Sequence, residues 1–201
     1  MPIVSADGTI VKSIIGPLFG HTFSMKNRRI FSLLIFFFFV ASLAGYIWEV
    51  LLTFVLRGEW YNRGFLYGPW LPVYGFGALL FTLLLSSYRS HPVWLFFLSA
   101  ILGSFLELVT GLALSNYFHM RYWDYSSLPM DLMGYISLLP FLGFGLAGLV
   151  WIRYIAPFLT KLWNRFSSIS HKLFLFLFLG IFLLDYIVSM IVPNSGRGIT
   201  F

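Results

Sequence analysis

Long apolar runs are the feature that most constrains what this chain of 201 residues can fold into. A helix needs about 20 residues, at 1.5 Å per residue, to cross a hydrocarbon layer of roughly 30 Å. Because 59% of the residues are hydrophobic and 10% are charged, the chain cannot cover a water-soluble globule with polar side chains. The sequence therefore predicts an all-α integral membrane protein with about five transmembrane helices. The predicted spans lie near 30–56, 70–88, 93–115, 134–155 and 172–192.

The basic residues predict how these spans are oriented, because lysine and arginine are enriched in cytoplasmic loops. With a cytoplasmic N-terminus, nine basic residues fall on the cytoplasmic side and four on the outer side. The outer four are Arg57, Arg63, Arg121 and Arg197. We expect an N-terminal cytoplasmic or interfacial arm over 1–29, a single transmembrane domain over 30–192 and a short outer tail over 193–201. The basic residues flank apolar spans, which favours lipid headgroups over nucleic acid as their partner.

The two halves of the chain share a pattern. Glu49 and Glu107 each follow a glycine by four residues and precede an arginine by fourteen. The next spans carry YGFG at 74–77 and LGFG at 142–145. The offset is 58 residues at the first landmarks and 68 at the last. This pattern indicates a possible parallel repeat of two helices, spans one and two against spans three and four, with an extra C-terminal helix.

Three acids, Glu49, Glu107 and Asp185, lie inside predicted spans, in the outer half of the bilayer. An acid at a helix centre costs about 2.5–3.5 kcal/mol on insertion scales, so each should face protein or trapped water. Each glutamate also has small residues every four positions on its own helix face, which permit close helix contact. We therefore expect the first and third helices to pack together with both glutamates turned inward. The stripes are Ala41, Gly45, Glu49 and Thr53, and Ser99, Gly103, Glu107, Gly111 and Ser115.

The charged groups of the outer loops allow two interpretations. Arg63 and Arg121 could pair with the glutamates and only fix the loops, or they could line a polar cavity that binds a solute or a lipid headgroup. In the second loop, Arg121 and Asp124 could form a local pair. Alternatively, the loop is a lid whose Trp123 and Tyr125 stack on a ligand. On the last span, Asp185 with Ser189 four residues later is interpreted as a helix-docking pair.

Several motifs resemble a known family. They are Trp48-Glu49, RGFLYGPWLPVYGFG at 63–77, LELVTG at 106–111 and RYWDYS at 121–126 with Gly134. Over roughly residues 40–155 the chain resembles the CmpB-type ABC-transporter permeases, and the N-terminal arm and fifth helix lie outside that resemblance. It implies a small multi-span protein of the bacterial cytoplasmic membrane. The sequence contains no Walker A pattern, so we expect any ATPase to be a separate chain.

These observations favour a small transport protein or permease component with an outward-facing polar site in the membrane. The alternatives are an intramembrane enzyme acting on a lipid or cell-envelope precursor, and a structural or regulatory partner subunit. The sequence indicates no cofactor and no metal site. Expected partners are membrane lipids and a second copy, a separate ATPase or another subunit. The candidate substrate-binding residues are Glu49, Arg63, Tyr67, Trp70, Tyr74, Glu107, Arg121, Trp123, Asp124 and Tyr125.

Overall fold

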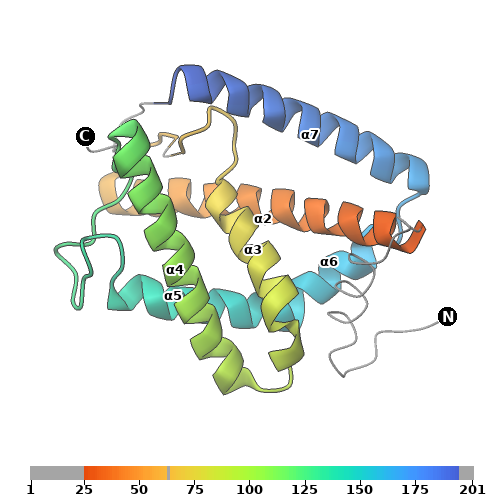
Figure 1. The fold of residues 1–201 in the computed structure, drawn as a ribbon, viewed down its shortest axis with the longest axis horizontal. Coiled ribbons are helices and arrows are strands. Elements are labelled where there is room, and N and C mark those ends of the chain that lie inside the picture. The colour runs from red at the N-terminus through yellow and green to blue at the C-terminus, as the bar shows by residue number, and fades with distance from the viewer. Residues whose placement is uncertain (1–24, 63, 195–201) are drawn as a thin grey trace.

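The computed structural model describes residues 25–62 and 64–194, and in this part of the chain all regular secondary structure is helical. Figure 1 shows the arrangement of the helices. The α-helices are α2 (Met25–Arg57), α3 (Pro72–Leu85), α4 (Pro92–Phe118), α5 (Leu138–Val150), α6 (Ala156–Trp163) and α7 (Ser168–Ile191). A 3₁₀ turn, η1 (Ser86–Tyr88), follows α3, and a π-helical turn, η2 (Trp151–Ile155), joins α5 to α6.

Four helical segments of the described chain are long and apolar enough to cross a membrane. They are Arg29–Arg57, Pro92–Phe118, Leu138–Trp163 and Ser168–Ile191. The second predicted span corresponds to a shorter apolar helix, Pro72–Tyr88. The prediction of an all-α membrane protein with about five helices is therefore confirmed. Most of the predicted arm and tail, residues 1–24 and 195–201, lie outside the described residues.

The fourth span differs most from its prediction of 134–155. It begins later, at Leu138, because Gly134 has a φ of +70° and Ser137 is extended. It also continues past Arg153 through η2 and α6 to Trp163. Pro157, in the first turn of α6, lacks the N–H of a regular helix, and a neighbouring π-helical turn accommodates such a gap in the hydrogen-bond ladder.

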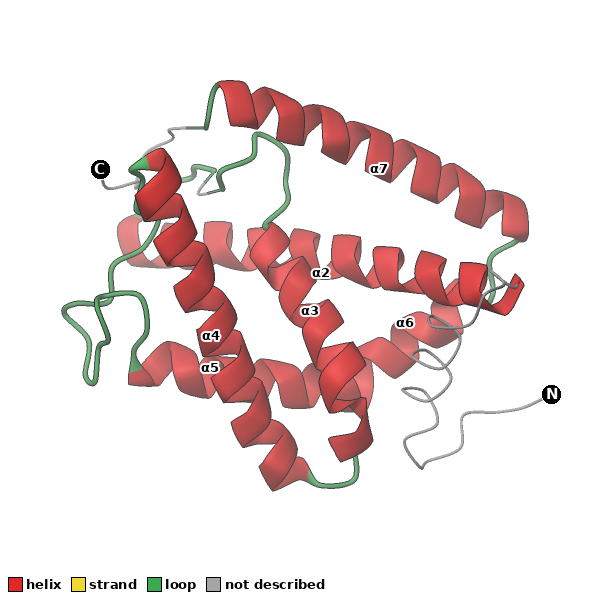
Figure 2. Ribbon diagram, in the orientation of Figure 1, coloured by secondary structure: helices red, strands yellow, loops and turns green. Residues whose placement is uncertain are grey.

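The helices form two packed pairs, α2 with α3 and α4 with α5, and α3 also packs on α4. Helix α7 packs on α2. In Figure 2, the loops 58–71 and 119–137 lie toward one end of the molecule, and the connection from α6 to α7 lies at the other. Helices α2 and α4 both lead into the loops at the first of these ends, so the two pairs follow the chain in the same order, as a parallel repeat requires.

Glycine contacts show the register of the repeat. A Cβ on Gly45 would collide with the ring of Tyr74, and a Cβ on Gly103 would lie 2.6 Å from Cγ of Phe144. The two contacts are equivalent when α2 is compared with α4 and α3 with α5. The glycines, at 45 and 103, are then 58 residues apart, and the rings that they face, at 74 and 144, are 70 residues apart. The contact of Gly75 with Phe38 and that of Gly145 with Phe96 obey the same two offsets. The predicted offset of 68 was therefore wrong by two residues.

The same contacts correct the predicted packing of the small-residue stripes. Gly45 faces α3, whereas Gly103 faces α5. Each stripe thus packs against the second helix of its own pair, and the prediction that the first and third helices pack through their stripes was wrong. Small side chains permit a close approach, but they do not determine which neighbour makes it.

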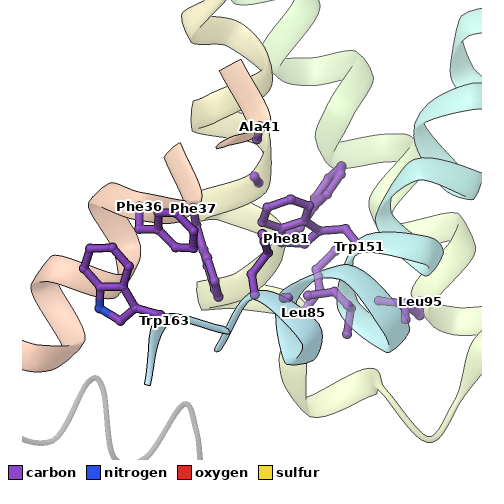
Figure 3. Packing of buried hydrophobic residues seen from close by; sticks show 12 residues of the cluster. Phe36, Phe37, Ala41, Phe81, Leu85, Leu95, Trp151 and Trp163 are labelled. Carbon is purple, nitrogen blue, oxygen red and sulfur yellow. The ribbon is translucent and has the colours of Figure 1, made fainter. Parts of the chain in front are cut away.

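A buried aromatic core joins the two pairs on the side of the α6–α7 connection (Figure 3). Phe36 stacks on Trp163 at 4.5 Å, and Phe37 meets Trp151 edge to face at 5.5 Å. The indole of Trp151 donates a 2.9 Å hydrogen bond to Oγ1 of Thr82, so its polar edge is satisfied inside the core. This core leaves the later halves of α2 and α4, which carry Glu49 and Glu107, beneath the loops 58–71 and 119–137.

Candidate functional site: the glutamate cluster

Two carboxyl–phenol pairs lie below the loops. The Tyr74 hydroxyl donates a 2.6 Å hydrogen bond to Oε1 of Glu49, and the Tyr125 hydroxyl donates a 2.9 Å bond to Oε1 of Glu107. The two carboxyl groups lie within electrostatic range of each other. We call these four residues the glutamate cluster. It draws on α2, α3, α4 and the second loop. That the two glutamates meet in one shared site stays a prediction.

The two pairs differ because the repeat is imperfect. Gly45 lies one turn before Glu49 and leaves room for the Tyr74 ring, whose hydroxyl then reaches the carboxylate. The residue equivalent to Tyr74 in the second pair is Phe144, which has no hydroxyl. Glu107 instead receives its hydrogen bond from Tyr125 in the loop. The hydrogen bonding of Glu107 therefore depends on the conformation of the second loop.

Glu107 is the most deeply buried acid of the cluster, with 8% of its surface exposed. Its Oε2 atom is buried and has no hydrogen-bond partner among residues 25–62 and 64–194. The hydroxyls of Ser104, one turn earlier on α4, and of Thr53, one turn after Glu49 on α2, are likewise buried and without partners in this part of the chain. Such groups cost free energy when they stay unsatisfied. These buried atoms lie on the helices α2 and α4 that carry the two glutamates.

Arg121 organises the second loop. Its Nη2 lies 3.1 Å from Oδ1 of Asp124 and donates a hydrogen bond to the carbonyl of Met133, while its Nε donates to the carbonyl of Trp123. The guanidinium also lies over the Tyr135 ring, 4.6 Å from its centroid. The local Arg121–Asp124 pair, one of the two interpretations of this loop, is confirmed. The backbone N–H of Ser126, followed by the Arg121 charge, lowers the pKa of Asp124.

Trp123 is directed toward α4 and contributes to docking the loop. Its indole donates a 3.2 Å hydrogen bond to the carbonyl of Tyr135, and both rings lie against the bare backbone of Gly111. Gly111 is one turn after Glu107, which binds Tyr125. The second loop therefore attaches to a single face of α4 at two successive turns.

The first loop forms a separate polar centre. Asp185 of α7 accepts hydrogen bonds from the backbone N–H groups of Tyr67 and Gly68 and from the indole of Trp70. Tyr67 and Trp70, two of the candidate residues, are thus attached to Asp185 and not to the glutamate cluster. Arg63 lies outside the described residues. Ser189 also donates to Asp185 at 3.3 Å, but this bond lies within α7. The predicted docking of the fifth helix is made by Asp185 to the first loop and not by a bond between two helices.

Sequence reasoning missed Tyr135 and the loop amides that bind Asp185. Tyr135 comes directly after Gly134, which follows the RYWDYS motif, and this position weakly indicated that Tyr135 belongs to the loop contacts. Backbone N–H donors cannot be recognised in a sequence. In the described residues, no group of three or more His, Asp or Glu is placed to hold a metal ion. An apolar hollow lined by Pro92, Phe97 and Leu149 lies near the start of α4, about 20 Å along the helix from Glu107.

A family model matches residues 36–190, which is most of the chain and nearly all of its helical part. The match extends through most of α7, so the expectation that the fifth helix lies outside the family resemblance was wrong. Neither the comparison with curated proteins nor the comparison with solved structures gave a match. The chain belongs to the family described as "Putative ABC-transporter type IV", the CmpB type that its motifs resemble.

Proposed function

We propose that the protein is the membrane-embedded subunit of a transport system, and that the glutamate cluster is its proton-carrying site. Family membership and the apolar helices make it a membrane transport-related protein. The remainder of the proposal concerns the site. With a cytoplasmic N-terminus, as the basic residues favour, the cluster lies toward the outer face beneath both loops.

The observation that carries this proposal is the state of Glu107. One carboxyl oxygen accepts a hydrogen bond from Tyr125, and the other is buried without a partner among the residues that the structure describes. A buried carboxyl with a free oxygen and a second carboxyl nearby is a place where one proton is bound favourably between the two acids. The Tyr74 and Tyr125 hydroxyls can rotate and pass hydrogen bonds between such groups.

The alternative of an enzyme acting on lipids needs a cleft that opens sideways from the acids into the bilayer. Glu107 is instead buried, and Trp123 packs on Gly111 and does not project toward a headgroup. Both observations disfavour a lipid-binding cleft at this site. An ATPase or a second copy of the chain as partner remains part of the proposal, because a single bundle of this size offers few helices to enclose a solute path.

Proton movement in proteoliposomes tests the proposal. The purified protein is reconstituted with a pH-sensitive dye inside the vesicles, and a potassium diffusion potential drives proton entry. We expect wild-type protein to acidify the lumen and Glu107→Gln to reduce the rate at least tenfold. Glu59→Gln is the matched control because Glu59 is exposed in the first loop, and it should retain the wild-type rate. Equal rates for wild type and Glu107→Gln would remove Glu107 from the mechanism.

A second measurement does not depend on turnover. A hydrophobic carbodiimide forms a stable adduct with protonated carboxyl groups in apolar surroundings, and peptide mass mapping locates it. We expect an adduct at Glu107 and none at the exposed Glu59 or Asp131. An unmodified Glu107 in a protein that also shows no proton movement would refute the proposed site.

A further inference from the structure

The first loop surrounds a carboxylate with neutral donors. Oδ1 of Asp185 accepts from the backbone N–H of Tyr67 at 3.0 Å, and Oδ2 accepts from that of Gly68 and from Nε1 of Trp70, both at 2.9 Å. We call these three donors the loop cradle. Successive backbone N–H groups that converge in this way form an anion-binding concavity. The occupant here is part of the chain itself, because Asp185 belongs to α7.

In the part of the chain that the structure describes, the cradle binds its carboxylate without an ion pair. Within the described residues, the partners of Asp185 are the three cradle donors and the Ser189 hydroxyl, none of which is charged. The recognition therefore depends on the geometry of N–H groups and not on an arginine or lysine. Such a site accepts any oxyanion that presents two acceptor oxygens at carboxylate spacing.

The cradle is held in shape by contacts that do not involve Asp185. The Asn62 amide donates to the carbonyls of Leu66 and Tyr67 and accepts from the N–H of Gly64. These bonds turn the carbonyls of the loop away, so that the next N–H groups point inward. The ring of Trp70 packs edge to face on Phe39 of α2 at 5.8 Å, which fixes the direction of its indole N–H.

Gly68 allows the close approach of the occupant. A Cβ at this position would lie 2.8 Å from Oδ2 of Asp185 and would collide with the Trp70 indole. The backbone must therefore be bare where the anion docks. Close approach of backbone to a ligand is a recurring reason for glycine in loops.

Helix α7, which supplies the occupant, is a peripheral element. It meets α2 through Phe174, Phe178 and Phe182, and Ser189 is its buried residue. Little of its apolar surface is covered by the rest of the described chain. Its polar attachments to the first loop in the described chain are Asp185 and, just after the helix, Asn194, which donates to the carbonyls of Gly64 and Phe65. Release of the carboxylate would therefore remove one of these two attachments at this end of α7.

We propose that the loop cradle is an oxyanion receptor for a small carboxylate or phosphate group, and that Asp185 is its built-in competing occupant. An external anion and Asp185 use the same three donors, so binding of one displaces the other. A tethered group has an effective concentration in the millimolar range or higher, and an external anion therefore competes weakly in the wild type. Removal of the Asp185 carboxylate should leave the receptor open. This proposal is independent of the glutamate cluster.

Thermal unfolding of the detergent-solubilised protein tests the receptor. Asp185→Ala should lower Tm, and sodium acetate or inorganic phosphate should raise the Tm of this variant saturably by about 2–8 °C, whereas sodium chloride at equal ionic strength should not. The wild type should respond much less, because its cradle is filled. Asp185→Ala combined with Trp70→Phe lacks one donor and should need a higher anion concentration for the same rise.

The source of the anion is distinguished by comparing inorganic phosphate with a short-chain phosphatidic acid below its micelle concentration. A rise with the lipid alone indicates a headgroup, and a rise with acetate or phosphate indicates a free solute. If Asp185→Ala does not fold, Asp185→Ser is measured in the same way. A folded Asp185 variant whose Tm shows no response beyond that to chloride, for every oxyanion tested, would overturn the proposal.

Discussion

The hydroxyl of Tyr125 lies 2.9 Å from Oε1 of Glu107 and donates a hydrogen bond to this buried carboxyl. Tyr125 belongs to the second loop and Glu107 to α4, so the bond joins the outer surface to the interior. The loop is held at the same helix face by Trp123 on Gly111. A change in the hydrogen bonding of Glu107 is therefore transmitted directly to the loop.

Tyr125→Phe should destabilise the protein by about 1–3 kcal/mol, because a buried carboxyl then has no donor. The loop 119–137 should also open more often, since one of its two attachments to α4 is lost. Thermal unfolding and amide hydrogen exchange in the loop measure the two effects. Tyr117→Phe is the control because Tyr117 is 81% exposed. Equal exchange in Tyr125→Phe and wild type would show that Trp123 alone holds the loop.

Gly45→Ala should destabilise the protein and disturb the Glu49–Tyr74 bond. The new Cβ would occupy the position of the Tyr74 ring, which packs on α2 at this glycine. We expect a loss of about 1–3 kcal/mol from overpacking. Gly103→Ala should cost a similar amount against Phe144, whereas Gly143→Ala and Gly180→Ala should be neutral or stabilising because nothing lies within 4 Å of a Cβ there. Comparable midpoints for all four variants would contradict the proposed register of the repeat.

The sequence predicted the elements that depend on hydrophobicity and composition. Apolar runs located α2, α3, α4, α5 and α7 but not α6, and the energetic cost of buried acids predicted that Glu49 and Glu107 would turn inward. The spacing of Arg121 and Asp124 likewise indicated a local pair, which the structure contains. Each of these inferences needed only short-range pattern and a known energetic penalty.

Other features could not be predicted because they depend on which surfaces meet. The stripes of Gly45 and Gly103 indicated close contacts, but the partners were α3 and α5. The offset of 68 followed the letters of the GFG motif, whereas the side chains pack with an offset of 70. The amides that bind Asp185 leave no trace in residue identity, since every residue except proline has one.

Tyr122 should resist ionisation at alkaline pH. Burial raises the pKa of its phenol to about 12, from a usual 10. Below pH 10 the phenol is neutral in both the folded and the unfolded states, so it causes no pH dependence. Between pH 10 and pH 12 the unfolded state loses the proton first, so stability should fall as pH rises through this window. Tyrosinate absorbance and unfolding midpoints of wild type and Tyr122→Phe measure the effect, and an identical alkaline loss in both would exclude Tyr122 as its source.

Gly134→Ala should be among the most damaging single changes in the second loop, for two separable reasons. Gly134 has a φ of +70°, where a residue with a Cβ is strained. Its Cβ would also collide with the guanidinium of Arg121 and lie 2.6 Å from Oδ1 of Asp124. We expect a loss of about 2–4 kcal/mol, measured as a shift in the unfolding midpoint.

Gly58→Ala separates the two reasons. Gly58 has the same φ of +70°, but nothing lies within 4 Å of a Cβ there, so this variant reports backbone strain alone, at about 1–2 kcal/mol. The excess cost of Gly134→Ala is then the cost of displacing Arg121. Replacing Arg121 by alanine in the Gly134→Ala background should remove that excess, because the colliding group is gone. If Gly134→Ala costs no more than Gly58→Ala, Arg121 is free to move away, and its contacts do not fix the loop.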